Sequence, residues 1–407
     1  MNYKKLVPTD SFIGQYLSYM DYVETAQAYD FWCAMWAIGI GVTRDVYVDR
    51  PTAPVYLNWY IILAADSGIT RKSTAIASIS SIVSRSHPLL TGKTSPEALD
   101  LYLHERTRTD GCAQANISVE ELVTILGREG YMKTMPGLLT DLYSCKDLRT
   151  SPGTLKSGEI TQRNVYVNFL SASTPSWLVT AINPSVIEGG FTSRVIFVVD
   201  DSRKRTIAWP TNRSESSLSS LESCYKQIID KSRDIGALTI SDGGLRKFTK
   251  WYNSRPTHRD PFQSSFEARE DDHVLRCAAC LAINDGTLEI QSRHIGNACK
   301  IIARVKDSAT NLFGGTYSDD IRFRESIERI RTILIEAGTD GIRHNKVQQR
   351  LARRLDSKEF KLVMDIMHEC NMVQIFEMER GRFYRATKGI EKFGVVTSVI
   401  EKLAPTG

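Results

Sequence analysis

Residues 63–74 read LAADSGITRKST, and the rest of the chain is organised around them. The run before them, VYLNWYIIL at 55–63, is short, apolar and rich in β-branched and aromatic side chains, which predicts a buried strand. After the loop, AIASI at 75–79 predicts a helix that begins close to Lys72. A strand, a glycine-bearing loop and a helix in this order indicate one unit of an α/β domain.

The same order is the layout of a phosphate-binding loop. Backbone N–H groups at the start of a helix face an anion, and the helix dipole favours its charge. We expect Lys72 to reach the β- and γ-phosphates of a nucleotide and the Ser73 hydroxyl to ligate Mg²⁺. The full signature has glycine at its first position and before the lysine, where this chain has Asp66 and Arg71, with Gly68 between them. An ordinary strand-turn-helix is therefore the alternative.

A second group of candidate residues follows the segment ANISVEEL at 115–122, a short semi-apolar strand that ends in two acids. A nucleoside triphosphatase needs one carboxylate near Mg²⁺ and another that polarises the attacking water. We assign Glu120 to the metal and Glu121 to the water, with interchangeable roles. The alternative is that residues 118–121 only cap a helix.

The next predicted strand, 164–170, is flanked by two further candidates. Before it, PGTLKSGEI at 152–160 predicts a hairpin with Lys156 at its basic tip, or an ordinary solvated turn. After it, SASTP at 171–175 places the Thr174 hydroxyl where it either orients water near a γ-phosphate or begins a turn.

Two arginines complete the candidate set. Arg194 follows a glycine pair in EGGFTSR at 188–194 and precedes the predicted strand 195–199. In that position it can be presented to the site of a neighbouring subunit, or it forms an ordinary surface ion pair. Arg269 and Arg276 are seven residues apart, so they share a face if one helix carries both.

The bulk properties set wide limits. A chain of 407 residues has room for two or three domains. No apolar run is long enough to cross a bilayer and no signal-peptide core follows the N-terminus, so we expect a cytoplasmic protein without a membrane partner. The net charge of +5 permits a nucleic-acid partner without demanding one. Among eight scattered cysteines, Cys277 and Cys280 form the one CxxC, and we expect buried thiols there because no second pair has zinc spacing.

Beyond the strands, the pattern is helical. We expect a helical N-terminal layer at 9–45, strands at 44–50 and 55–63, and helices at 73–84 and 94–106. A serine-rich linker is predicted at 214–223, and residues 216–313 show helical periodicity, including helices at 245–252, 272–283 and 295–313. The last region has helices at 327–337, 342–351 and 357–369 and strands at 373–378 and 382–386, which is the winged helix-turn-helix pattern. Residues 322–361 contain eleven Lys/Arg and six Asp/Glu, which favours a phosphate backbone, with a protein-binding module as the alternative.

Together these motifs resemble those of AAA+ ATPases of the helicase kind, in particular minichromosome-maintenance-like helicases and the primase-helicases of phages and mobile elements, over about residues 10–385. The resemblance gives each motif a counterpart: Ser67, Gly68, Arg71, Lys72, Ser73 and Thr74 for Walker A, residues 117–121 for Walker B, Thr174 for sensor 1, Arg194 for the arginine finger, Arg269 for sensor 2 and Lys156 for a DNA-contacting hairpin. The chain departs from the family at the Walker A glycines, at Glu120 where Asp is usual, and at Thr174 where Asn is usual.

The resemblance implies an α/β fold with an AAA+ core at 51–213, preceded by a helical region at 1–50 and followed by a helical lid at 214–320, a winged helix at 321–390 and a tail at 391–407. It implies an ATP- and Mg²⁺-dependent DNA helicase that forms a ring, a hexamer by the family pattern, and acts in replication of a phage or mobile element, beside a primase or polymerase. Single-stranded DNA would occupy the channel and duplex DNA the winged helix. The alternatives are a regulatory ATPase that loads or recruits other proteins, and a DNA-binding initiator that does not hydrolyse ATP.

Overall fold

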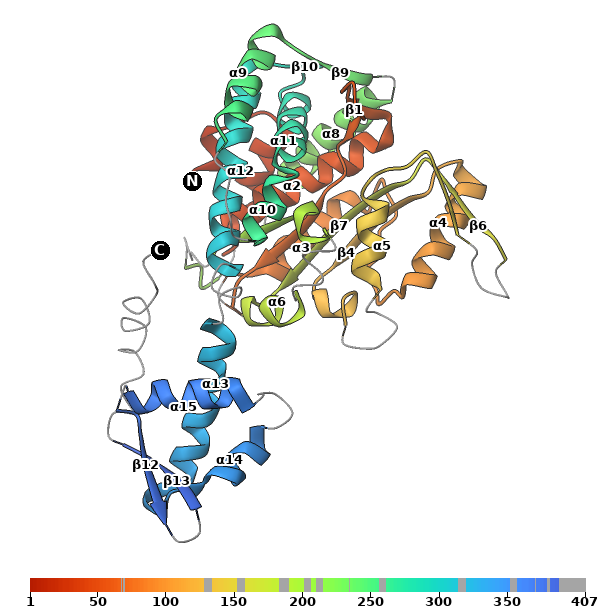
Figure 1. Ribbon diagram of the computed structural model, residues 1–407. Coiled ribbons are helices and arrows are strands. Elements are labelled where there is room, and N and C mark those ends of the chain that lie inside the picture. The colour runs from red at the N-terminus through yellow and green to blue at the C-terminus, as the bar shows by residue number, and fades with distance from the viewer. Residues whose placement is uncertain are drawn as a thin grey trace. The chain divides into compact units, whose positions relative to one another are not determined.

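The computed structural model describes residues 1–66, 68, 70–127, 134–151, 158–182, 190–200, 206–209, 215–233, 235–255, 261–313, 320–351, 357–369, 371–378 and 381–387. These residues form two compact units, Met1–Gly314 and Gly315–Gly407. The first unit contains a parallel sheet with helices on both faces (Figure 1), which confirms the predicted α/β class.

The central sheet has the strand order β4-β7-β3-β8, and all its neighbours are parallel. Its strands are Gln114–Val119 (β4), Tyr166–Ser173 (β7), Tyr60–Ala64 (β3) and Val195–Val199 (β8). Each strand is almost wholly buried, as expected for parallel strands covered on both faces. Leu90 adds a single parallel bridge to Ile117 at the outer edge of β4.

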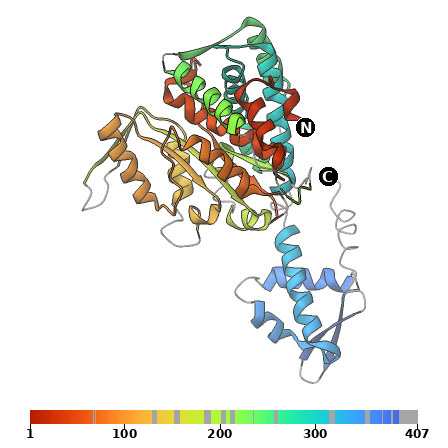
Figure 2. The ribbon, with the colours of Figure 1, turned by 180° about the vertical axis from the view of Figure 1, so that it is seen from behind.

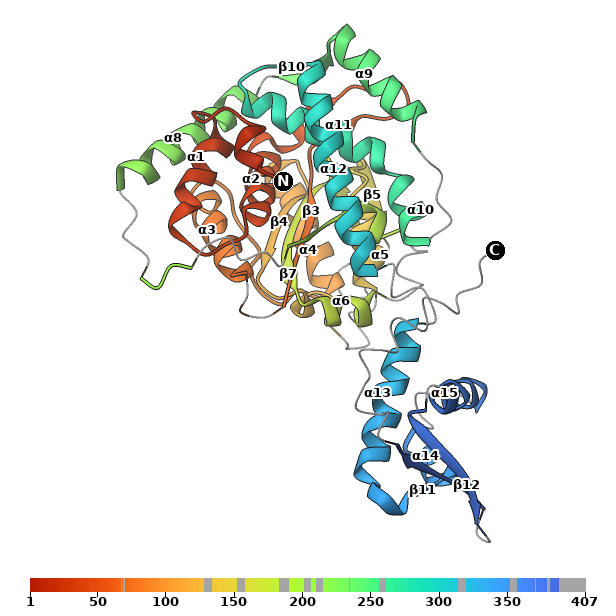
Figure 3. The ribbon, with the colours of Figure 1, turned by 90° about the vertical axis from the view of Figure 1, so that its left-hand side faces the viewer.

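Helices cover the two faces of this sheet separately (Figure 3). One face packs against helices α2 (Gln27–Val42) and α3 (Lys72–Val83), through residues such as Ile61 and Leu63. The other face meets α5 (Met135–Leu142), where the Tyr60 hydroxyl donates to the Leu139 carbonyl, and α12 (Ser292–Phe313), which packs on β8. The helices α4 (Pro96–Asp110) and α6 (Pro175–Ala181) connect strands of the same sheet.

A second sheet joins distant parts of the chain in the order β10-β9-β1-β2. Its strands are Val46–Val48 (β1), Val55–Tyr56 (β2), Gly236–Ile240 (β9) and Glu289–Ile290 (β10). The predicted single strand at 55–63 is therefore wrong, because β2 and β3 belong to different sheets. Side-chain hydrogen bonds replace the ladder between them: Asn58 donates to the Tyr143 carbonyl at 3.1 Å, and the Trp59 N–H donates to Asn168 at 3.0 Å.

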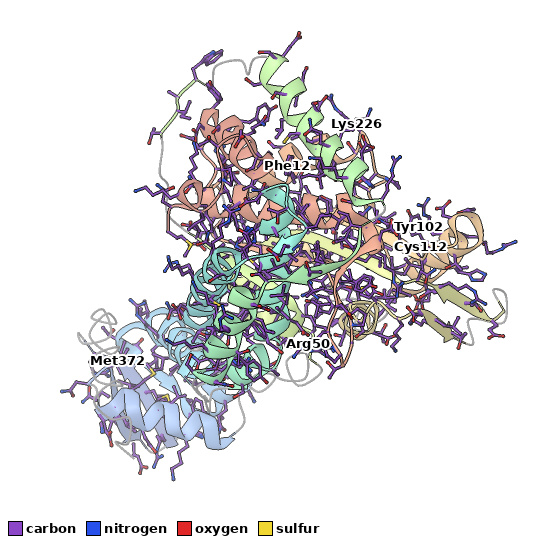
Figure 4. All side chains as sticks on the ribbon, turned by 90° about the horizontal axis from the view of Figure 1, so that it is seen from above. Phe12, Arg50, Tyr102, Cys112, Lys226 and Met372 are labelled. Carbon is purple, nitrogen blue, oxygen red and sulfur yellow. The ribbon has the colours of Figure 1, made fainter. Side chains whose placement is uncertain are left out.

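The N-terminal helices pack as predicted, and α2 is buried along almost its whole length between α1 (Phe12–Tyr19) and the sheet. Gly39 lies so close to the segment between β2 and β3 that a Cβ there would stand 2.5 Å from the Leu57 carbonyl oxygen. Figure 4 shows Phe12 inside this helical layer and Lys226 on its outside.

The predicted linker at 214–223 is wrong, because α8 (Glu215–Ser232) begins there and lies across α1 and α2 (Figure 2). Its apolar residues Leu221, Tyr225 and Ile228 recur at helical spacing and are buried, which outweighs the serine-rich composition. The helices α9 (Asp242–Asn253), α10 (Pro261–Glu267), α11 (Glu270–Asn284) and α12 confirm the helical pattern predicted for 216–313, whereas the strands β9 and β10 in the same region were not predicted.

The second unit has its own apolar core and the element order α13, β11, α14, α15, β12, β13. Its helices are Asp320–Glu336 (α13), His344–Leu351 (α14) and Ser357–Glu369 (α15). Its strands Ile342–Arg343 (β11), Val373–Met378 (β12) and Gly381–Ala386 (β13) form an antiparallel sheet in the order β11-β13-β12. The predicted helices and the hairpin are confirmed, and β11 is an additional strand.

Candidate functional site

The candidate site is a cleft of about 490 Å³ at the carboxyl ends of β3, β4 and β7. Parallel strands end at the same edge of a sheet, which is where open α/β sheets bind ligands. Because β7 lies between β3 and β4, the residue after β7 stands between the loop after β3 and the acids after β4. The cleft is lined by Gly68, Arg71, Lys72, Ser73, Thr74, Glu120, Glu121, Leu122, Val123, Ala172, Ser173, Thr174 and Trp177.

Arg71 occupies the position where the phosphate-loop signature has glycine, and its backbone adopts the left-handed conformation that glycine favours (φ 51°, ψ 43°). It directly precedes α3, whose first residue is Lys72. The Arg71 guanidinium turns to Glu24, with nitrogen–oxygen distances of 3.2 and 3.3 Å. Gly68 also has a positive φ of 80°, whereas Ser67 lies outside the described residues. The loop thus reaches the helix through a glycine-like turn without the glycine.

Lys72 lies inside the curve of this loop. Its Nζ donates to the carbonyl oxygens of Ala65, at 2.6 Å, and Asp66, at 3.2 Å. Partial burial lowers the pKa of Lys72, and the negative charge of Asp66 opposes that shift. The first turn of α3 contains no acidic residue, and Ser73 in it is exposed. A lysine, free backbone N–H groups and a hydroxyl therefore meet at the positive end of a twelve-residue helix, a setting suited to phosphate.

Glu120 and Glu121 stand opposite this helix end. Strand β4 ends at Val119, and both acids follow it with exposed side chains. The turn after them is only the 3₁₀ turn Leu122–Thr124, and Glu121 makes no side-chain capping bond to it. Glu121 thus occupies the N-cap position of this turn without capping it through its carboxylate, and the assigned roles of the two acids stay predictions. Ser118 holds β4 against α3 through a hydrogen bond between its hydroxyl and that of Ser80, at 2.7 Å.

Thr174 lies in the cleft but also caps a helix. Its hydroxyl accepts a hydrogen bond from the Trp177 N–H at 3.4 Å at the start of α6. The Ser176 hydroxyl is 3.3 Å away. The interpretation that Thr174 begins a turn is therefore confirmed, and its role in orienting water stays a prediction.

Arg194 and Arg269 do not line the cleft. Arg194 ends the 3₁₀ turn Thr192–Arg194, and its guanidinium donates to the Gly190 carbonyl oxygen at 2.7 Å. Burial lowers the pKa of Arg194, and the nearby positive charge of Arg269 lowers it further. In the part of the chain that the structure describes, Arg194 forms no ion pair, so the alternative of a surface ion pair is not what the structure shows. Arg269 pairs with Asp272 at 3.2 Å.

The predicted shared face of Arg269 and Arg276 depended on one helix carrying both, and Arg269 stands at the N-cap position of α11. Both residues nevertheless line one cavity of about 360 Å³. Arg276 is buried and structural: it donates to the Tyr56 carbonyl at 2.7 Å and to the Tyr143 hydroxyl. One helical turn away, Cys280 is a buried free thiol 3.4 Å from the Trp59 indole nitrogen, and burial raises its pKa to about 12.

Cys277 is also a buried free thiol, so neither cysteine of the CxxC is in a disulfide. Within the described ranges, no group of three His, Cys, Asp or Glu side chains could hold a metal ion.

Three residues that support the site have no recognisable signal in the sequence. The Tyr29 hydroxyl lies 2.8 Å from the Ala64 carbonyl oxygen and 2.6 Å from that of Asp200, at the ends of β3 and β8. Glu24 holds Arg71 and also accepts from the Ile207 N–H at 2.8 Å. His273 is buried in α11 and lies 2.9 Å from the Ser193 carbonyl, beside Arg194. Each pairs with a residue far away in the chain, which no local pattern reveals.

Lys156 lies outside the described residues. The strands on either side of it, Leu148–Ser151 (β5) and Ile160–Arg163 (β6), pair antiparallel, which confirms the predicted hairpin. Across the described ranges, no helix combines the length and apolar character needed to cross a membrane.

Comparison with known proteins gives a structural likeness only. No family model matches the sequence, and no curated protein matches it. Among solved structures, the chain is similar to a full-length MCM homolog from Methanopyrus kandleri, at 13% identity and a TM-score of 0.44. The similar part is 73% of this chain and 59% of that protein.

Proposed function

We propose that this protein is an ATP- and Mg²⁺-dependent motor of the AAA+ kind that translocates on DNA. The observation that carries the proposal is the cleft itself, where Lys72 and Ser73 at a helix start face Glu120 and Glu121 across the end of β7. Basic and hydroxyl groups on one wall and two carboxylates on the other are what a nucleoside triphosphatase needs. The resemblance of the motifs in sequence order supports the same assignment.

Each side of the cleft has a separate task. The N–H groups at the start of α3 and the Lys72 ammonium hold the phosphates, after Lys72 leaves the Ala65 and Asp66 carbonyls. Ser73 and Glu120 would hold Mg²⁺ through the oxygen atoms that this ion prefers. When bound, the metal ion would offset charge that develops on the phosphates. Glu121 accepts a proton from the attacking water, and Thr174 orients that water.

The proposal includes a ring of subunits, a hexamer by family pattern. Neither Arg194 nor Arg269 lines the cleft of its own chain, so each would reach a γ-phosphate only in the cleft of a neighbouring copy, in addition to that copy's own Lys72. In this arrangement Arg194 exchanges its bond to Gly190 for the neighbour's nucleotide, and Arg269 lies beside it. Lys156 at the hairpin tip would grip single-stranded DNA in the channel.

We assign the remaining regions accordingly. Residues 51–213 would be the ATPase core, 214–320 the lid and 321–390 a winged helix, whose order of three helices and three strands fits α13 to β13. The C-terminal unit would bind DNA or regulate the motor. Work in the replication of a phage or mobile element is part of the proposal, and it rests on the motif resemblance alone.

The test is ATP hydrolysis with and without single-stranded DNA, in the native chain and in Glu121→Gln. The amide keeps the size of the carboxylate but cannot accept a proton, so the variant should bind ATP normally and lose hydrolysis by 10²-fold or more, an order-of-magnitude estimate for a general base. Normal hydrolysis in Glu121→Gln would exclude the assigned role. Activity gained by mixing Arg194→Ala with Lys72→Ala protein would support a site shared between subunits.

A second candidate is a regulatory ATPase that binds DNA and recruits other proteins without unwinding. It is favoured by Arg194, which is half-buried and bonded within its own chain. A strand-displacement assay separates the two, because only the motor releases a paired strand. If calorimetry detects no ATP binding, both ATPase candidates are excluded, and a DNA-binding initiator that does not hydrolyse ATP is the remaining one.

A further inference from the structure

The C-terminal unit carries a row of flat side chains on the outer face of its small sheet. Side chains alternate between the two faces of a strand. Ile342, Tyr384 and Val373 face the apolar core of the unit. The residues between them in the strands, Phe383 and Phe376 among them, therefore point to the opposite face and are not part of that core.

Four of these outer side chains stack across the three strands. Phe376 and Phe383 are register partners, with ring centroids 5.8 Å apart and planes inclined by 21°. Arg343 is the register partner of Phe383 and its guanidinium carbon lies 5.8 Å from that ring. Arg385 lies 4.9 Å from the Phe376 ring. All four side chains are partly exposed, so flat apolar and cationic surfaces share one face.

One donor beside these rings is unpartnered. Among the described residues, the Nε of Arg385 is buried and has no hydrogen-bond partner. Gly381, the register partner of Met378, adds no side chain to the turn end of the row.

The sheet and α15 differ in net charge. In a winged helix-turn-helix domain, the helix at the position of α15 is the one that usually enters a DNA groove. The helix α15 contains two lysines and three acidic residues, a net charge of −1 with its histidine neutral. The three strands contain three arginines and one acid, Glu377, which pairs with Arg382 at 3.4 Å. The sheet is therefore more positive than α15, and α14, with two basic residues and no acid, is equally positive.

We propose that this outer face binds single-stranded nucleic acid, independently of the ATPase assignment. Unpaired bases would stack on Phe376 and Phe383, and Arg343 and Arg385 would contact the phosphates. Aromatic platforms flanked by cations bind single strands in this way with little sequence preference. Duplex DNA fits less well because its bases are already stacked. An acidic peptide would need the arginines but not the rings.

The test is binding of the full-length chain, without nucleotide, to a labelled oligonucleotide of about 12 nucleotides, a length within the range of such sites. Phe376→Ala and Phe383→Ala should each weaken binding roughly 5- to 100-fold, whereas Phe383→Tyr, which keeps a stacking ring, should keep it. Lys361→Ala, an exposed lysine of α15, is the matched control and should change affinity less than about 2-fold, as a screened surface charge would.

The second readout maps the contact directly. Irradiation of a 5-iodouracil-substituted strand should crosslink peptides that contain Phe376 or Phe383, which a purely structural role would not produce. An abasic strand should bind the native chain and both alanine variants equally. Three results would each overturn the proposal. They are crosslinks in α15, tighter binding of duplex than of single strands, and a loss of acidic-peptide binding in the two alanine variants that equals their loss of single-strand binding.

Discussion

The backbone at Arg71 offers a test of the phosphate loop that does not need a ligand. Its left-handed conformation costs a residue with a side chain about 1 kcal/mol, a cost that glycine does not have. Glycine loses about 0.5–1 kcal/mol through the greater freedom of the unfolded chain. The ion pair to Glu24 is worth about 0–1 kcal/mol, because the Arg71 side chain is 56% exposed. Arg71→Gly should therefore change the free energy of unfolding by less than about 1 kcal/mol.

The sharper comparison is with alanine at the same position. Arg71→Ala loses the ion pair and keeps the strain, so Arg71→Gly should equal or exceed it in stability, by up to about 1 kcal/mol. Ala77→Gly, at an exposed position of the same helix, is the control. There glycine should cost about 1 kcal/mol relative to alanine, because φ is helical.

The assay is urea unfolding followed by tryptophan fluorescence. All six tryptophans lie within residues 1–314, so the signal reports on the unit that holds the loop. If Arg71→Gly proves less stable than Arg71→Ala, and Ala77→Gly still shows the ordinary helix penalty, the left-handed turn before Lys72 is refuted. The comparison with a phosphate loop would then lose its geometric support.

Two further predictions concern the residues that support the site. Burial, and then the charge of Arg276, lower the pKa of His273 to about 3, against about 6.5 in an unfolded chain. Below pH 6.5 the unfolded state therefore takes up a proton that the native state refuses, and the free energy of unfolding should fall by about 1.4 kcal/mol per pH unit until pH 3. Between pH 7 and pH 4.5, His273→Gln should lose about 2.5 kcal/mol less unfolding free energy than the native chain in urea unfolding, and equal losses would contradict the burial of a neutral His273. Tyr29→Phe should destabilise the first unit by about 1–2 kcal/mol, because two strand-end carbonyls lose a shared partner, whereas the exposed Tyr252→Phe should be neutral. A neutral Tyr29→Phe would mean that water serves those carbonyls equally well.

The sequence predicts the parts of this molecule that depend on local pattern. The helix beginning near Lys72, the strand before Glu120 and the hairpin of the C-terminal unit all follow from periodicity and turn residues. The meeting of the phosphate loop and the two acids could also be predicted, because motifs that follow separate parallel strands lie at the same edge of the sheet.

The sequence-based predictions of secondary structure are wrong where contacts between distant residues determine the local structure. Residues 55–63 form two strands because Asn58 and Trp59 hydrogen-bond to residues more than 80 positions away. The serine-rich segment at 215–223 is helical because α1 and α2 bury its apolar side. Tyr29, Glu24 and His273 could not be predicted as supporting residues, because a single tyrosine, glutamate or histidine acquires its role only from the folded chain.

We propose that a nucleoside triphosphate binds in the cleft between Lys72 and the acids after β4. Isothermal calorimetry with a non-hydrolysable ATP analogue and Mg²⁺ can compare the native chain with Lys72→Ala. We expect saturable binding by the native chain, and binding roughly one to three orders of magnitude weaker in the variant, because a charged hydrogen-bonding partner is lost. Equal affinity in both proteins would place the nucleotide outside this cleft and refute the proposed site.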